Sequence, residues 1–291
     1  MNQICVEAVD ISGNRTQLLI PVKVQGRDPV DEFHGRKFAV IIGISKFQNT
    51  EAGVSDLKYA DADARSVYQF LQTKSAGSFS TANIRFLANE ESTIKNVRDS
   101  LSAFVAQIEE DDLLLIFFAS HGTPDPYYPQ DLYFVVHDTV VDRMADTALA
   151  MKEFKQLLDQ NLRAKRLLVL IDTCHGAGIT SARGISNNLA NLYAEKLLFR
   201  EEGTAVITSS DVNEASLESD LWGGGHGVFT HFLLQGLSGK ADDNLDNLVT
   251  AGELFRYVRS NVRLATEFRQ NPRMMPGQNE SLALSAVLHQ K

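Results

Sequence analysis

The sequence contains few cysteines and no long apolar segment. Two cysteines, Cys5 and Cys174, occur among 291 residues, and this number says little about the redox compartment of the protein. No stretch approaches the ~18 consecutive apolar residues that a membrane-spanning helix needs. The N-terminus lacks a basic region followed by an apolar block, so we expect no signal peptide.

Basic residues are scarce relative to acidic ones. The 28 Lys and Arg against 37 Asp and Glu give a formal net charge of −9. This balance argues against nucleic acid as a partner and allows a preference for cationic substrates. The apolar fraction of 44% and the charged fraction of 22% are typical of a globular protein. The length suffices for one large domain, with or without an appendage.

The first 25 residues differ in pattern from the rest of the chain. Within residues 4–24, apolar residues recur with a period of two on both sides of a turn-forming segment at 10–14. This pattern predicts a β-hairpin and resembles the last two strands of bacterial immunoglobulin-like modules. Because two strands alone are marginally stable, the hairpin either belongs to a longer secreted or surface protein or packs on the main domain. We therefore divide the chain into a hairpin at 1–25, a linker at 26–36 and a main domain at 37–291.

From Lys37 onward, apolar runs of strand length alternate with segments whose apolar residues follow helical spacing. Strands are predicted at 38–43, 113–119, 132–136, 167–171, 204–208 and 282–287. Helices are predicted around 57–71, 94–108, 154–162, 189–197, 228–237 and 254–264. Strands separated by helices indicate an α/β fold, with a mainly parallel sheet that helices cover on both faces.

Two of these strands end on reactive side chains. The first is followed by Ser120-His121-Gly122, and the second by Asp172-Thr173-Cys174-His175-Gly176, which places His121 and Cys174 53 positions apart. The carboxyl ends of parallel strands are where the sites of α/β sheets lie, so neighbouring strands would bring a thiol beside a base. A disulfide between Cys5 and Cys174 would consume this nucleophile, so we expect both thiols to be free. His175 is adjacent to Cys174 in sequence and its side chain should diverge, so we do not expect it to be the base.

These motifs resemble those of metacaspases and their bacterial relatives, the caspase-like cysteine peptidases. The resemblance runs from about Lys37 to about Val287 and includes the segments 57–64, 225–230 and 236–242. It implies a three-layer αβα sandwich with a mostly parallel six-stranded sheet, and an endopeptidase that acts through a Cys174–His121 dyad. The backbone N–H groups of Gly122 and Cys174 are the implied oxyanion donors. We expect a monomer that acts on peptide or protein substrates and requires no cofactor.

The resemblance also implies an acidic S1 pocket, the pocket for the substrate residue before the scissile bond (P1). Asp172 lies two positions before Cys174 on one strand, so the two side chains point to the same side. Caspases, which cleave after acidic residues, have glutamine at this position. A carboxylate pairs bidentately with a guanidinium, so we expect Arg or Lys at P1, with Asp63 as a second acid of the pocket. Alternatively, Asp172 caps a helix or anchors a loop, and Asp63 complements a helix dipole.

The acidic segment 242–253 has the spacing of an EF-hand loop. Oxygen ligands would come from Asp242, Asn244, Asp246 and Glu253, so calcium binding is an alternative interpretation of this segment. Asn247 stands where such loops carry glycine, although asparagine tolerates the left-handed conformation. The favoured interpretation is an acidic turn followed by a capping box that starts the next helix.

A long connector, 177–203, follows the cysteine motif. It carries Arg183, Lys196 and Arg200, and Arg183 and Arg200 are candidate sites of self-cleavage. The resemblance supports this, because processing in the family often occurs here. The alternative is a surface helix with ordinary basic residues.

Two alternative functions remain open at this point. One is a caspase-like peptidase with an acidic P1 preference, and the other is a non-catalytic caspase-fold scaffold or adhesion module, which the immunoglobulin-like hairpin suggests. The presence of both Cys174 and His121 argues against the second alternative. We expect a cytoplasmic location if the sequence is the full chain, and a secreted or surface location if it is part of a larger protein.

Overall fold

The computed structural model describes residues 2–9, 15–22, 35–128, 130–174, 203–211, 214–274 and 278–287. At the N-terminus, β1 (Asn2–Val9) and β2 (Arg15–Val22) pair in antiparallel fashion as a separate two-stranded sheet. This confirms the predicted hairpin. The division of the chain into hairpin, linker and main domain stays a prediction.

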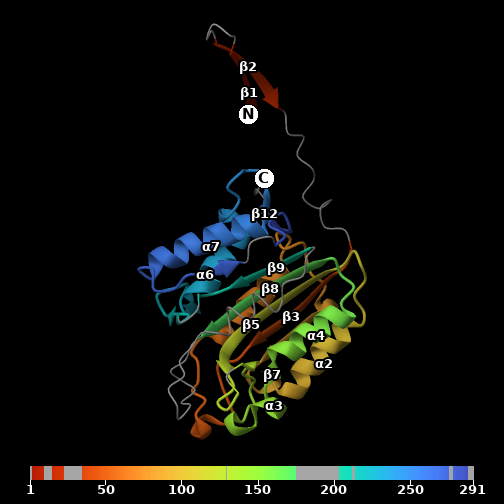
Figure 1. Cartoon of the computed structure of the whole chain (residues 1–291), viewed down its shortest axis with the longest axis vertical. Coiled ribbons are helices and arrows are strands. Elements are labelled where there is room, and N and C mark those ends of the chain that lie inside the picture. Colours follow the sequence, from red (N-terminus) through yellow and green to blue (C-terminus); the bar gives the residue numbers. More distant parts are fainter. Residues whose placement is uncertain are drawn as a thin grey trace.

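A mostly parallel sheet forms the centre of the main domain, and its strands run in the order β13-β9-β8-β5-β3-β4 (Figure 1). All neighbouring pairs along this path are parallel except β13–β9, which is antiparallel. This confirms the predicted α/β class with its mainly parallel sheet. The strands are β3 (Lys37–Gly43), β4 (Ile84–Ala88), β5 (Leu113–Pro124), β8 (Arg166–Cys174), β9 (Thr204–Thr208) and β13 (Arg273–Met274).

The strand predicted at 282–287 forms, but it does not join this sheet. It is β14 (Ala283–Ala286), and it pairs with β12 (Leu248–Thr250) in a sheet of its own. The strand order ends instead with the two-residue β13, which follows no apolar run. Sequence patterning shows that a segment is extended and apolar, but not which edge it pairs with.

Helices cover the two faces of the sheet as separate layers (Figure 1). One layer contains α1 (Ala60–Leu71), which contacts β3, β5 and α6 (Val228–Gln235), and α6 packs in turn on α7 (Ala251–Ala265). On the other face, α2 (Ile94–Val105) packs against α4 (Met151–Asn161). Each helix buries one apolar stripe against strands that are themselves fully buried, which is why all three layers share one core.

Two short strands extend the main sheet: β6 (Leu132–Phe134) pairs antiparallel with the end of β5, and β7 (Leu149–Ala150) pairs antiparallel with β6. The other elements are α3 (Met144–Thr147), β10 (Glu218–Ser219), β11 (His226–Gly227), the π-helical turn Gly236–Lys240, and short 3-10 turns at Thr50–Ala52, Thr81–Asn83, Asn89–Glu91 and Val141–Arg143. None of the helices in the described part of the chain is long and apolar enough to cross a membrane.

Candidate active site

The register of two central strands brings the predicted dyad together. β5 and β8 are parallel neighbours, and His121 lies opposite Cys174 at their carboxyl ends. The apolar runs that precede them are completely buried, as Phe117 and Ile171 illustrate, so both strand ends are fixed by the core. The side chain of Cys174 and residues 175–202 lie outside the described part of the chain, and with them His175, Arg183 and Arg200.

His121 is held on two sides by the segment between β3 and α1. Its side chain is buried, and Nε2 lies 2.8 Å from the backbone carbonyl oxygen of Ser55. A carbonyl only accepts, so Nε2 donates, and in the neutral ring Nδ1 is the basic nitrogen. The ring also stacks on Phe47 with a centroid distance of 5.1 Å. A backbone carbonyl therefore orients the histidine in the way that a third side chain does in other nucleophile–base sites.

An ion pair ties that segment together next to His121. Asp56 follows Ser55, accepts from the backbone N–H of Phe47 at 3.1 Å, and pairs with Lys46 at 2.8 Å. The Lys46 ammonium is the largest cause that holds the pKa of Asp56 below its ordinary value. Since the pair joins the residues around Phe47 to those around Ser55, it fixes both contacts of the His121 ring.

Two buried carboxylates, Asp63 and Asp172, lie close together although they are far apart in sequence. Asp172 is 5% exposed, and its carboxylate accepts from the hydroxyls of Ser216 (2.6 Å) and Thr230 (3.0 Å). It comes from β8, two residues before Cys174. Asp172 is therefore a buried carboxylate near the end of β8 whose hydroxyl partners are neutral.

Asp63, on α1, is the second carboxylate. It is 3% exposed and accepts from His226 Nδ1 at 2.6 Å and from the backbone N–H of Gly227 at 3.0 Å. A Cβ atom at Gly227 would lie 2.9 Å from Asp63 Oδ2 and 3.1 Å from Asp172 Oδ2. Both carboxylates thus face the same glycine, and together they are called the carboxylate pair (Asp63 and Asp172) below.

The carboxylate pair is buried, and His226 is a basic side chain that contacts it through Asp63. Among the residues that the structure describes, neither Asp63 nor Asp172 has a lysine or arginine partner. Burial raises the pKa of Asp63 to about 7, and the nearby Asp172 charge adds to the rise. Burial likewise raises the pKa of Asp172. Buried charges are normally paired, so the raised pKa values reflect two carboxyl groups whose charged forms the surrounding protein disfavours.

The predicted calcium loop has the local structure of a capped acidic turn. The Asp242 carboxylate accepts from the backbone N–H groups of Asp246 (3.2 Å) and Asn247 (3.1 Å). Glu253 is buried and forms a capping box with Thr250 at the start of α7. In the described ranges, no three His, Cys, Asp or Glu side chains are grouped so that they could hold a metal ion. Calcium binding through Asp242, Asn244, Asp246 and Glu253 stays a prediction.

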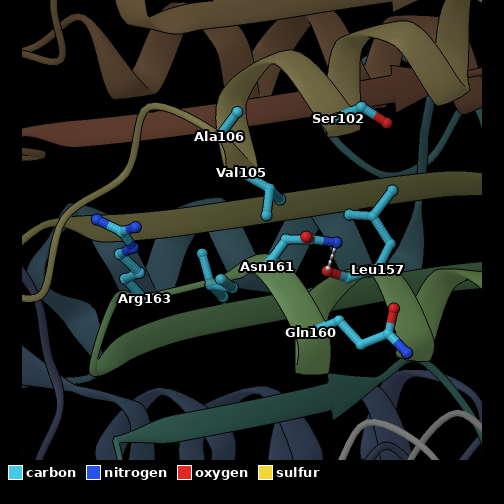
Figure 2. A pocket seen from close by; sticks show the side chains of 8 residues that line it. Ser102, Val105, Ala106, Leu157, Gln160, Asn161 and Arg163 are labelled. Carbon is cyan, nitrogen blue, oxygen red and sulfur yellow. Dashed lines mark hydrogen bonds between the residues drawn. The ribbon is translucent and has the colours of Figure 1, made fainter.

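A separate pocket lies between the ends of α2 and α4, as Figure 2 shows. Its lining includes Val105 and Leu157, and the Asn161 amide donates to the Leu157 carbonyl at 3.3 Å. Both helices end here shortly before β5 and β8 begin, which places the pocket at the amino ends of those strands. His121 lies at their carboxyl ends, so this pocket is not part of the site.

Sequence reasoning missed the residues that orient the site. Ser55, Phe47 and Ser216 lie in loops without a motif, and only their positions in the fold connect them to His121 and Asp172. His226 and Thr230 belong to the motif Gly225-His226-Gly227-Val228-Phe229-Thr230, which carries the family resemblance but does not by itself predict a role for either residue. A histidine between two glycines at the start of a helix is the one signal that could have pointed to a role beside the carboxylate pair.

Comparisons with known proteins identify the family of this chain. A family profile described as the caspase domain matches residues 36–282. Metacaspase-4 of Arabidopsis thaliana is 26% identical over 148 residues, which make up 49% of this chain but only 34% of that protein. The crystal structure of GSU0716 from Geobacter sulfurreducens matches with a TM-score of 0.59 and 15% identity, covering 87% of this chain and 100% of that one, and shows the fold alone. Since the profile covers most of the sequence, the chain belongs to the caspase-domain family of cysteine peptidases.

Proposed function

We propose that the protein is a monomeric cysteine endopeptidase that cleaves after Arg or Lys. Cys174 is the nucleophile, His121 is the base, and the carboxylate pair binds the P1 cation. The observation that supports the P1 assignment is the pair itself: two buried carboxylates with no lysine or arginine partner among the described residues, one of them two residues from Cys174. An acidic P1 residue would be repelled by this pocket, which disfavours the alternative specificity.

In the proposed reaction, His121 Nδ1 takes the thiol proton, and the Cys174 sulfur attacks the scissile carbonyl carbon. The oxyanion accepts hydrogen bonds from the backbone N–H groups of Gly122 and Cys174. The carbon–nitrogen bond then breaks as the imidazolium protonates the leaving amine, and a thioester remains. His121 next deprotonates a water molecule, which hydrolyses the thioester and regenerates the thiol.

Fluorogenic peptides that differ only in the P1 residue test the proposal. The wild-type protein should hydrolyse Arg and Lys peptides and leave the matched Asp peptide intact. Each assay is run with calcium and with a chelator, so that a calcium requirement is measured at the same time. Preference for the Asp peptide would refute the P1 assignment, and inactivity on all peptides in both conditions would refute the endopeptidase.

The affinity of the carboxylate pair for a cation should rise with pH. The pKa of Asp63 is about 7, so its carboxyl is mostly neutral at lower pH and charged at higher pH. In the Cys174→Ala variant, which removes the thiol titration, we expect agmatine to bind roughly tenfold more tightly at about pH 8 than at about pH 6. Calorimetry gives both constants. Asp63→Asn in the same background should flatten the pH dependence, and an affinity that falls as pH rises would contradict the prediction.

Self-processing in the connector 177–203 is a further expectation. An enzyme that cuts after Arg or Lys has a local substrate there at high effective concentration. We expect cleavage after Arg183, whose neighbours are small and polar, in preference to Arg200, which follows a predicted helix. Mass spectrometry of wild type beside Cys174→Ala, with Arg183→Gln and Arg200→Gln as matched controls, identifies the bond. A wild-type chain that stays intact in calcium while it turns over peptides would rule self-processing out.

A further inference from the structure

His226 lies against the carboxylate pair without belonging to the dyad. It opens β11, opposite Ser219 of β10, and its side chain is 16% exposed while that of Asp63 is 4% exposed. The distance of 2.6 Å between His226 Nδ1 and Asp63 Oδ1 is that of a hydrogen bond to a charged group. An ionised carboxylate only accepts, so Nδ1 carries the proton and donates.

The backbone around His226 fixes the direction of its ring. Gly223 has a φ of +62°, and a Cβ atom there would lie 2.9 Å from His226 Cδ2 and 3.2 Å from His231 Nδ1. Gly223 therefore fits between the two imidazoles only because it has no side chain. The next residue of β11, Gly227, donates its backbone N–H to the same carboxylate at 3.0 Å. His226 and Gly227 thus form a two-donor clamp on Asp63.

We propose that His226 is a positioning residue that sets P1 specificity. Its Nδ1–H donates to Asp63, which favours the ionised form of that carboxyl and keeps it turned toward Asp172, so that the pocket presents two carboxylates to a P1 guanidinium. Burial and the second carboxylate both oppose the charge on Asp63, and the donors that favour it are His226 and the Gly227 backbone. A guanidinium presents several donors in one plane and fits two carboxylates that face one point. This inference rests on the proposed cleavage after Arg.

Three variants separate this role from a structural one. His226→Leu removes the donor to Asp63. His226→Asn removes the imidazole but keeps an N–H donor near the position of Nδ1. His231→Leu is the matched control, because it removes a neighbouring imidazole that has no bond to the carboxylate pair. For an Arg peptide we expect His226→Leu to raise KM by about tenfold or more with kcat nearly unchanged. His226→Asn and His231→Leu should stay within about threefold of wild type. The rate of Cys174 alkylation by iodoacetamide should be the same in all of them.

An unchanged KM in folded His226→Leu, or an equal loss in His226→Asn, would overturn the inference. If His226→Leu does not fold, ¹⁵N NMR of the inactive Cys174→Ala variant tests the inference instead, because it identifies which ring nitrogen of His226 carries the proton. The Nδ1–H tautomer is expected, and the Nε2–H tautomer would overturn the proposed donation. These outcomes are distinct from a failure of the proposed function, which would appear as a wild-type protein that does not cleave the Arg peptide.

Discussion

Replacing Cys174 by alanine is expected to abolish peptide hydrolysis. The sulfur forms the covalent intermediate, and no other group in the proposed mechanism forms that bond, so the loss in kcat should be about 10⁴-fold or more. His121→Ala should come close to this, because general acid–base catalysis contributes roughly 10²–10⁴-fold and the nucleophile and base act as a unit. The measurement is hydrolysis of the preferred fluorogenic peptide by folded variants, with calcium and with chelator.

The matched control for this experiment is Cys5→Ser. Cys5 lies in β1 of the separate two-stranded sheet, so its substitution should leave the rate unchanged. Thermal melting of each variant establishes that the loss of activity does not come from unfolding. Retained hydrolysis in folded Cys174→Ala would remove the cysteine from the mechanism, and a slow rate in Cys5→Ser would show that the hairpin contributes to the activity.

Asp172→Asn should lower activity and raise stability at the same time. Without this carboxylate the P1 cation is left partly unpaired in a buried pocket, a loss of roughly 2–5 kcal/mol in binding. We therefore expect kcat/KM for Arg and Lys peptides to fall by about a hundredfold or more, mainly through KM. The hydroxyls of Ser216 and Thr230 can still pair with the asparagine amide, so the fold should persist.

The stability effect has a defined direction with pH. Burial raises the pKa of Asp172, so the folded state holds a proton that the unfolded state has lost, and the free energy of unfolding falls as pH rises through that window. Asparagine carries no such penalty. The melting temperature of Asp172→Asn should therefore exceed that of wild type at about pH 8. The difference should shrink toward about pH 4, where the Asp172 carboxyl of the folded wild type is neutral, as the asparagine amide is. A variant less stable than wild type at the higher pH would show that the carboxylate stabilises the fold.

The strands of the sheet were predictable to the extent that they are apolar runs. Residues such as Ile41, Phe117 and Ile171 are completely buried, and each lies in a continuous apolar segment that predicts a strand covered on both faces. β13 is two residues long and carries no such signal, and β14 carries the signal but pairs with β12. Which strand pairs at the edge of a sheet depends on the tertiary packing of distant segments. Local periodicity in the sequence therefore does not predict the edge strand.

The sequence by itself determined where the reactive residues stand along the chain and that the strand ends carrying them are neighbours. A buried parallel strand must end at the same edge as its neighbours, so His121 and Cys174, each directly after an apolar run, lie opposite each other in the register of β5 and β8. Only the tertiary structure decided what surrounds them. The carbonyl of Ser55 reaches His121 from 66 positions away, and His226 reaches Asp63 across 163 positions. Such contacts depend on how loops and helices pack over the sheet, and a hydrogen bond forms only when that packing brings donor and acceptor within about 3 Å.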